Sequence, residues 1–545
     1  MARHPLRARL ILAGCSIAAI VLMMAGLEVW QRALHSAPTS SDFVTENQLT
    51  WQREMDKPLF RAVSRGGRYY LVHAYSAMRF STGPERILPL EKEPGKTRLL
   101  FIGESSAGLS ATATRRIIDS DPDLGRFEVL NCAVSGGSLV MVENRFRECS
   151  QYSPNAVILL FGHNLFFSLR PISLFSYWTF EVSRRSALLN RFATMLRDNY
   201  LMSSWSSFDD PAVRWRRLEK FIAQVAALAR ARHIPLILCT APVNMWVLPE
   251  IPVGKKSSVL YNPRYLEARY LYAVGRHEEA IKTLESLVLN SPSAWWRWRL
   301  GAWLYQAGEY GQAAFFLSDA RNLDQEHDRA SSAVNDVIRQ SAYRFGARLV
   351  DADLMIREHS PHGIPGWTSF IDCQHLDDPA FVRLAAAVLS DVNGGRTPRV
   401  HVPWEKRLSL TQQLEHPPIP FWQGDSVKSS RLWLTLSYVA QARLAEVLTQ
   451  GEASAEAAAP GGISRAIIFM AFAQACWRAG KKIQAFRFNA DAARTAPGWE
   501  EPLIQRALFD LGTNRRDEAA LLLRKALKMN PDRADAAYFL KRSAG

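Results

Sequence analysis

Short apolar runs alternate with amphipathic segments between residues 97 and 250. Apolar runs of this length, closed by Gly, Pro or polar residues, predict buried β-strands, and the longer segments between them carry helical spacing. Strands that alternate with helices predict a parallel sheet with helices on both faces. Three of the four runs end in Gly, Ser or Asn, and ligands bind at the carboxyl ends of such strands. The predicted strands are TRLLFIG (97–103), FEVLNCAVSGG (127–137), NAVILLFGHN (155–164) and IPLILCTAP (234–242).

The pattern changes after residue 260, where helical segments recur at a fixed spacing. Gly275 and Gly308 are 33 residues apart, and near the C-terminus Ala485 and Ala519 are 34 apart. This period of helix-turn-helix units resembles that of tetratricopeptide repeats. Such units bury their apolar faces only against neighbours, so each pair is expected to pack on another helical element.

The sheet domain resumes after the first group of repeats. The segment YRFGARLVDADLMIREHS (343–360) has the pattern of a returning strand followed by a helix. The predicted domain order is an N-terminal transmembrane anchor (1–30), a spacer and lead-in (31–96), the first part of the sheet domain (97–260), inserted tetratricopeptide-like repeats (261–334), the second part of the sheet domain (335–395), a connector (396–430) and C-terminal tetratricopeptide-like repeats (431–545).

The N-terminus carries an uninterrupted apolar run of 18 residues, Leu10–Leu27, preceded by three arginines. A run of this length is enough for one helix to span a bilayer, and the basic flank predicts that the N-terminus stays in the cytoplasm. A cleaved signal peptide fits less well, because the run has no clean small-residue cleavage site. A lipoprotein signal ending at Cys15 leaves too short an apolar stretch before the cysteine. The sequence therefore predicts a single-pass protein of the bacterial inner (cytoplasmic) membrane with a periplasmic body.

Composition, charge and cysteine content narrow the function classes and the binding partners that the sequence allows. The 545 residues are 48% hydrophobic and 22% charged, which is a folded composition, and the net charge is +15. The basic residues are scattered along helices without a dense block or nucleic-acid motif, so no nucleic-acid partner is predicted. The six cysteines show no metal-binding spacing, and no metal or cofactor is expected. A disulfide such as Cys132–Cys149 is compatible with export, but buried free thiols are slightly favoured.

Candidate residues for serine chemistry follow the predicted strands. Such chemistry needs a hydroxyl, a base, a group that orients the base and N–H donors for the oxyanion. Ser105 opens a helix after the first strand, where the helix N-terminus favours negative charge. Asp372 and His375 are three residues apart in DCQH, a spacing that lets the carboxylate orient the imidazole. Gly136 and Asn164, at the ends of the second and third strands, offer a backbone N–H and a side-chain amide.

Taken in order, the blocks GES, NCAVSG, FGHN and DCQH resemble those of the SGNH (GDSL-type) hydrolase family. The resemblance covers about 97–250 and 335–395. It implies an α/β fold class, a flavodoxin-like three-layer α/β/α sandwich. To this fold the chain adds inserted and C-terminal all-α tetratricopeptide-like repeats and an N-terminal transmembrane helix. The anchored arrangement with repeats looks like a recurring bacterial type of this family.

The same resemblance assigns roles to the candidate residues. It implies that Ser105 is the nucleophile and that His375, oriented by Asp372, is the general base. It further implies an oxyanion hole formed by the Ser105 amide, Gly136 and Asn164. No metal ion or organic cofactor is implied.

Three neighbours of these residues need separate interpretation. Glu104 stands where the family usually has Asp, a residue that supports the turn. Ser106 is predicted to be a helix-capping hydroxyl rather than the nucleophile. His163 has two open interpretations, a contact with substrate or a strand-end histidine satisfied by hydrogen bonds.

The predicted function is that of a membrane-anchored serine hydrolase that cleaves O-acyl esters on surface or cell-wall glycans through an acyl-enzyme. An O-acyltransferase would use the same residues with a sugar hydroxyl in place of water, so the sequence does not separate the two. A third alternative, from another class, is a non-catalytic repeat scaffold for envelope assembly. The expected partners are an acylated small molecule or glycan, the membrane, and a protein bound by the repeats.

Overall fold

The chain divides into two compact units. The five-stranded sheet and the helix pairs belong to the unit formed by residues 64–70, 78–167 and 218–545. The predicted membrane span at 10–27 lies outside the described residues. Within the part of the chain that is described, no helix is long and apolar enough to cross a membrane. The computed structural model describes residues 59–73, 88–135, 137, 139–165, 211–249, 251, 256–324, 329–400, 409–415, 426–459 and 461–543.

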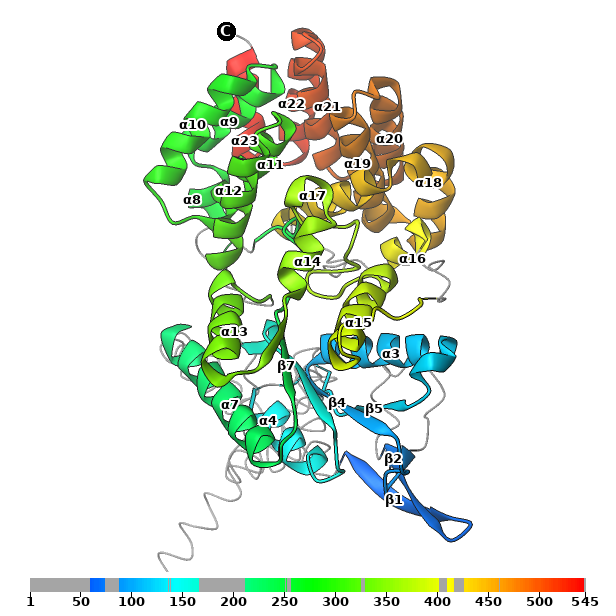
Figure 1. Cartoon of the computed structure of the whole chain (residues 1–545). Helices are drawn as coiled ribbons and strands as arrows, with labels where there is room; N and C mark the ends of the chain where they lie inside the picture. Colours follow the sequence, from blue (N-terminus) through cyan, green and yellow to red (C-terminus); the bar gives the residue numbers. More distant parts are fainter. Residues whose placement is uncertain are drawn as a thin grey trace, which may run out of the picture. The chain divides into compact units, whose positions relative to one another are not determined.

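The described residues of the sheet domain form a five-stranded, fully parallel sheet of order β5-β4-β6-β7-β8 (Figure 1). Because both faces of the sheet are covered, its strands are continuous apolar runs rather than alternating ones. The first of these strands in the chain, β4, lies inside the sheet. The next strand, β5, pairs with one side of β4, and β6, β7 and β8 follow in order on the other side. This puts β4 and β6 side by side at the point where the direction of winding reverses. The strands are β4 (Thr97–Gly103), β5 (Phe127–Asn131), β6 (Ala156–Leu160), β7 (Leu236–Cys239) and β8 (Arg348–Val350).

Helices cover both faces of this sheet, which gives three layers (Figure 1). On one face, α3 (Ser105–Ser120) and α15 (Asp378–Val392) share a buried cluster with alternate strand residues such as Phe101. On the other face, α4 (Leu139–Cys149) contacts β4, and α13 (Ser332–Phe345) contacts β7 and β8. The predicted parallel sheet with helices on both faces is therefore confirmed. The described residues also form α7 (Pro211–Ala231), α14 (Ala352–Glu358) and a small sheet of β1 (Phe60–Arg65), β2 (Arg68–His73) and β3 (Leu88–Pro89). Of these, β1, β2 and α7 include residues of both compact units.

The insertion between β7 and β8 consists of antiparallel helix pairs, as does the C-terminal region. Gly275 and Gly308 lie in the turns within the first two pairs, with φ of +86° and +87°. Glycine favours this left-handed backbone, which explains why it recurs with the repeat. The inserted helices are α8 (Lys256–Leu260), α9 (Pro263–Ala273), α10 (His277–Leu289), α11 (Ala294–Gln306) and α12 (Tyr310–Asn322). The later ones are α16 (Leu410–Glu415), α17 (Ser426–Ala442), α18 (Leu444–Ala458), α19 (Gly462–Arg478), α20 (Lys482–Thr495), α21 (Glu501–Leu511), α22 (Arg516–Met529) and α23 (Ala534–Ser543).

The two groups of helix pairs pack against each other although they are far apart in sequence. Tyr270 of α9 belongs to the same buried cluster as Leu523 and Phe539. Its hydroxyl donates to the carbonyl of Arg542 at 3.0 Å, and Glu267 accepts hydrogen bonds from Tyr538 and Arg542, both at 2.6 Å. The expectation that each pair packs on another helical element is therefore confirmed.

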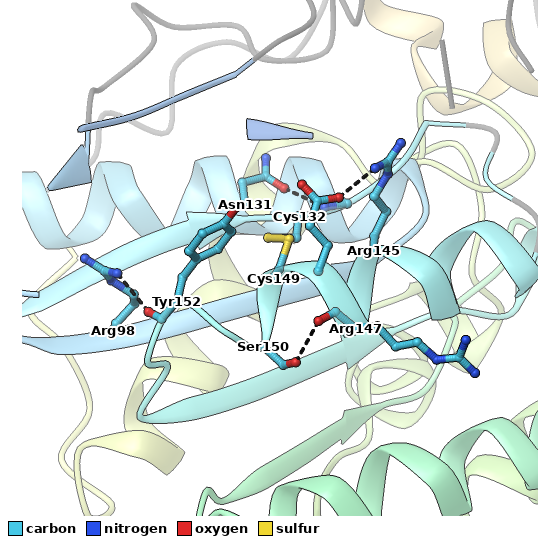
Figure 2. The surroundings of a disulfide bond; sticks show 10 residues. Arg98, Asn131, Cys132, Arg145, Arg147, Cys149, Ser150 and Tyr152 are labelled. Atoms are coloured by element: carbon cyan, nitrogen blue, oxygen red, sulfur yellow. Dashed lines mark hydrogen bonds and ion pairs between the residues drawn. A yellow bond between two sulfur atoms is a disulfide. The ribbon is translucent and has the colours of Figure 1, made fainter. Parts of the chain in front are cut away.

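A disulfide joins Cys132, just after β5, to Cys149 at the end of α4 (Figure 2). The sequence-based preference for free thiols is wrong for this pair. The fold brings the last residue of α4 beside the residue that follows β5, a contact that the sequence spacing does not show. The other described cysteines, Cys239, Cys373 and Cys476, are free.

The disulfide is expected to stabilise the sheet domain. Its partners are 17 residues apart, and closing a loop of this size is worth about 3 kcal/mol through the unfolded state. We expect the double variant Cys132→Ala, Cys149→Ala to lose about that much free energy of unfolding in urea titrations. Reductant should destabilise the wild type to the same level and leave the double variant unchanged. Equal unfolding midpoints for the oxidised wild type and the variant would contradict the prediction, and Cys476→Ala serves as the control.

Candidate active site

The candidate site lies at the carboxyl edge of β4 and β6, where the order of the sheet reverses. Open parallel sheets bind their ligands at this point. Gly103 ends β4 opposite Leu160 of β6, and its φ is +146°. A side chain at residue 103 would place its Cβ 1.8 Å from the Leu160 carbonyl oxygen. Glycine therefore lets the two strands stay close while the chain turns into Ser105.

The structure brings the three predicted triad residues together in one hydrogen-bonded chain. The Ser105 Oγ lies 2.7 Å from Nε2 of His375, and Nδ1 of His375 lies 2.6 Å from Oδ2 of Asp372. The other oxygen of Asp372 accepts the backbone N–H groups of Gln374 at 2.9 Å and His375 at 2.7 Å. The spacing of three residues thus fixes both the carboxylate and the imidazole within one tight loop.

The pKa values of Asp372 and His375 are shifted in the directions that favour proton transfer from Ser105 to His375. Burial raises the pKa of Asp372, but the hydrogen bond and charge of His375 and two backbone amides outweigh it, so the pKa falls below its usual range. Burial lowers the pKa of His375, but the hydrogen bond and charge of Asp372, together with Glu104, outweigh it and raise the pKa. Asp372 is therefore ionised, and the carboxylate strengthens His375 as a base.

Glu104 supports the turn that carries Asn164. Its side chain is fully buried, and its two oxygens accept the backbone N–H groups of His163 at 2.9 Å and Asn164 at 2.8 Å. Burial raises the pKa of Glu104 to about 7, although these amides and the charge of His375 act in the opposite direction. Glu104 therefore bridges the end of β4 to the turn after β6 through its two carboxyl oxygens.

Asn164 offers a donor beside the triad. Its side chain is 7% exposed, and its Nδ2 is buried without a hydrogen-bond partner in the structure as described. Ser105 is the first residue of α3, where backbone N–H groups have no partner within the helix. These two groups can stabilise an oxyanion. Gly136, the third predicted donor, lies outside the described residues.

His163 is a strand-end histidine with one ring nitrogen in a hydrogen bond, and its contact with substrate stays a prediction. Its Nδ1 accepts the N–H of Ala330 at 3.3 Å, and burial lowers its pKa to about 3, so the imidazole is neutral. The hydrogen bond at Nδ1 assigns the proton to Nε2. That nitrogen is buried and without a partner among the described residues. The charges of His375 and Asp372 also act on His163, which places a second unused donor near the triad.

The predicted capping role of Ser106 is wrong. Glu104 occupies the N-cap position of α3, and no side-chain hydrogen bond caps this helix. Ser106 is the second helical residue, and its buried Oγ has no partner in the described structure. The helix begins at Ser105, two residues earlier than a capping serine at 106 requires.

Sequence reasoning missed Asn244, which holds the loop of the triad. Its side-chain amide donates to the Asp372 carbonyl at 3.0 Å, and its backbone N–H donates to the Cys373 carbonyl at 3.2 Å. The Asn244 carbonyl in turn accepts from Arg329 at 2.9 Å, and Arg329 forms an ion pair with Asp324 at 2.8 Å. The position of Asn244 just after the fourth strand was an available signal. Nothing in the local sequence marks Arg329.

Comparison with known proteins adds little to this geometry. The sequence matches no family model and no curated protein. Among solved structures, the chain is similar to a GDSL-like lipase from Bacteroides thetaiotaomicron, with 11% identity and a TM-score of 0.29 over 56% of this chain and 92% of that one. It is also similar to an alpha/beta hydrolase enzyme from the metagenome of Lake Arreo, with 13% identity and a TM-score of 0.27 over 55% and 97%. At these scores the similarities carry no argument, and the interpretation rests on the residues.

Within the residues described, no group of three His, Cys, Asp or Glu side chains is arranged to hold a metal ion.

Proposed function

We propose that the protein is a serine hydrolase of the SGNH type that cleaves O-acyl esters. The observation that carries the proposal is the unbroken chain from Ser105 through His375 to Asp372, at 2.7 and 2.6 Å. A hydroxyl, a base and an orienting carboxylate in this geometry form the arrangement that activates serine for attack on a carbonyl.

The first half of the reaction forms an acyl-enzyme. The Ser105 oxygen attacks the acyl carbonyl carbon while its proton passes to Nε2 of His375, and Asp372 stabilises the resulting imidazolium. The oxyanion accepts hydrogen bonds from the Ser105 amide and the Asn164 side chain. The tetrahedral intermediate then collapses, the bond to the alcohol oxygen breaks, and His375 returns the proton to the departing alcohol.

The second half of the reaction releases the acid. Neutral His375 takes a proton from a water molecule, whose oxygen attacks the acyl carbon of the ester on Ser105. When this second intermediate collapses, the proton returns from His375 to the Ser105 oxygen. A sugar hydroxyl in place of water would transfer the acyl group by the same steps.

The proposal includes a place for the reaction. An N-terminal membrane anchor at 10–27 would hold the body on the periplasmic side, where acylated surface or cell-wall glycans are the available substrates. The Cys132–Cys149 disulfide supports this location, because disulfides persist in oxidising compartments. The repeats would then be free to bind a protein partner in the envelope.

A fluorophosphonate probe tests the proposed nucleophile on the intact protein. The probe phosphorus should bond to the Ser105 oxygen with loss of fluoride, and peptide mapping by mass spectrometry should find the adduct on this serine. Labelling should fail after heat denaturation, because the reactivity of Ser105 depends on His375. An unlabelled folded protein, or an adduct on another serine, would overturn the proposal and favour the non-catalytic scaffold.

A further inference from the structure

A small cavity lies within the helical array, far along the chain from the candidate active site. Its walls come from both groups of helix pairs. They are formed by α8, α9 and α11 of the insertion and by α17, α21 and α23, with the turn before α23, of the C-terminal region. The cavity volume is about 60 Å³. A water molecule needs roughly 10–15 Å³ by this measure, so the cavity has room for a group the size of a carboxylate. The walls include the aromatic and basic residues Tyr265, Arg269, Trp295, Arg299, Trp433 and Arg533.

The positive charges of the cavity are only partly matched. Arg533 is engaged by Glu500 at 3.0 Å, by Asp535 at 3.0 Å and by Glu501. Arg269 shares the Asp535 carboxylate at 3.4 Å. By contrast, Arg299 forms no ion pair within the described part of the chain. One guanidinium that faces the cavity therefore has no acidic partner.

The polar atoms left over in the walls are donors. The Arg299 Nε is buried without a partner, and so is the indole Nε1 of Trp433, in the structure as described. Leaving buried donors unpaired costs free energy that a bound acceptor recovers. A ligand that accepts hydrogen bonds and carries negative charge would therefore match the unpaired donors and the charge of Arg299.

The fully buried Tyr265 shows how positive the cavity is. Its oxygen accepts the indole N–H of Trp295 at 3.1 Å. Burial raises the pKa of this phenol, but the charges of Arg299 and Arg269, together with hydrogen bonds from Trp295 and Arg299, outweigh burial and lower it overall. The same two charges would act on any anion held beside the hydroxyl.

We propose that this cavity binds a carboxylate that sits beside an apolar group of the ligand. The planar guanidinium of Arg299 matches the two oxygens of a carboxylate, and Tyr265 and Trp433 can add donors. The carboxylates of Glu501 and Asp535 in the walls disfavour a doubly charged phosphate. The aromatic walls formed by Trp295 and Trp433 suit an apolar neighbour of the bound group. This site is independent of the ester chemistry proposed above.

Phenylacetate and phenylacetamide provide a direct test, because they differ in charge and hardly in shape. We expect isothermal titration of the full-length protein to show saturable binding of phenylacetate and at least about tenfold weaker binding of the amide. The Arg299→Gln variant should lose at least about tenfold in affinity for phenylacetate. Arg297→Gln on the same helix, whose wild-type side chain pairs with Asp319, is the matched control and should bind like the wild type.

Three outcomes would overturn the proposal. They are no phenylacetate binding to the wild type at tens of millimolar, equal affinity for acid and amide, or unchanged phenylacetate binding in Arg299→Gln. The comparison of acid with amide uses wild-type protein, so it decides the question even if the Arg299 variant fails to fold. Fluorophosphonate labelling of Ser105 should be the same with and without phenylacetate, which separates this site from the proposed active site.

Discussion

Replacing Ser105 by alanine is expected to lower kcat for ester hydrolysis by a factor of about 10⁴ or more. The variant keeps His375 and Asp372 but removes the only protein atom that the proposed mechanism bonds to the acyl carbon. Initial rates with p-nitrophenyl acetate, measured on equal amounts of folded protein, give the comparison. A rate that stays within tenfold of wild type would exclude Ser105 as the nucleophile.

The neighbouring serine supplies a matched control. Ser106 is also buried in the first turn of α3, and its Oγ has no partner in the described structure. Ser106→Ala therefore removes the same atoms from an adjacent position without breaking a hydrogen bond. We expect kcat to change less than about threefold, since no step of the mechanism uses this hydroxyl. A loss comparable to that of Ser105→Ala would mean that the roles of the two serines have been assigned incorrectly.

Replacing Glu104 by alanine is expected to lower kcat by about 10²-fold, which is the loss typical of one displaced oxyanion donor. The change leaves the amides of His163 and Asn164 without their acceptor and releases the turn that positions the Asn164 side chain. The value of KM should change less than kcat, because the lost interaction acts mainly in the transition state. A kcat within twofold of wild type would show that the turn holds its position without Glu104.

The Glu104→Gln variant separates charge from shape. The charge of Glu104 contributes to the raised pKa of His375, so its removal should move the acid limb of the kcat/KM profile to lower pH. Glu104→Asp keeps the charge and should leave that limb close to its wild-type position. Profiles that coincide for wild type and Glu104→Gln would contradict this electrostatic role.

The free energy of unfolding should depend on pH through the titration of Glu104. Since the pKa of Glu104 is about 7 in the folded protein against an ordinary 4.5, the folded state binds this proton more tightly. The contribution of Glu104 is therefore fully present below about pH 4.5 and is lost as the pH rises through 7. The Glu104→Gln variant should lack this fall in the free energy of unfolding between the two pH values.

The sheet and the triad could be predicted because their signals are local. Each strand is a short apolar run closed by polar or small residues, and Asp372 and His375 lie three residues apart in one loop. Ser105 is marked by its place directly after the first strand. These patterns require no knowledge of how distant segments meet.

The missed features depend on contacts between distant segments. The hydrogen bond from Arg329 to the Asn244 carbonyl joins residues 85 positions apart. The Cys132–Cys149 disulfide depends on the position of the end of α4 relative to β5. Sequence spacing alone cannot show that the amide of Ala330 faces His163. The repeat period also does not predict that α9 packs on the C-terminal helices. The period describes the two helices within each pair and does not say which other helices the pair contacts.

The contacts at the end of the insertion set a lower limit on the size of a working catalytic fragment. The boundary at 334 invites removal of residues 261–334 and reconnection of β7 to α13. That cut would take away Arg329, which holds Asn244 and through it the Asp372 loop, and Ala330, whose amide fixes the tautomer of His163. The last residues of the insertion therefore support the triad loop and cannot be removed with the repeats. A deletion within the insertion has to keep Asn244 and stop before Arg329, and it must replace the anchor that Asp324 provides.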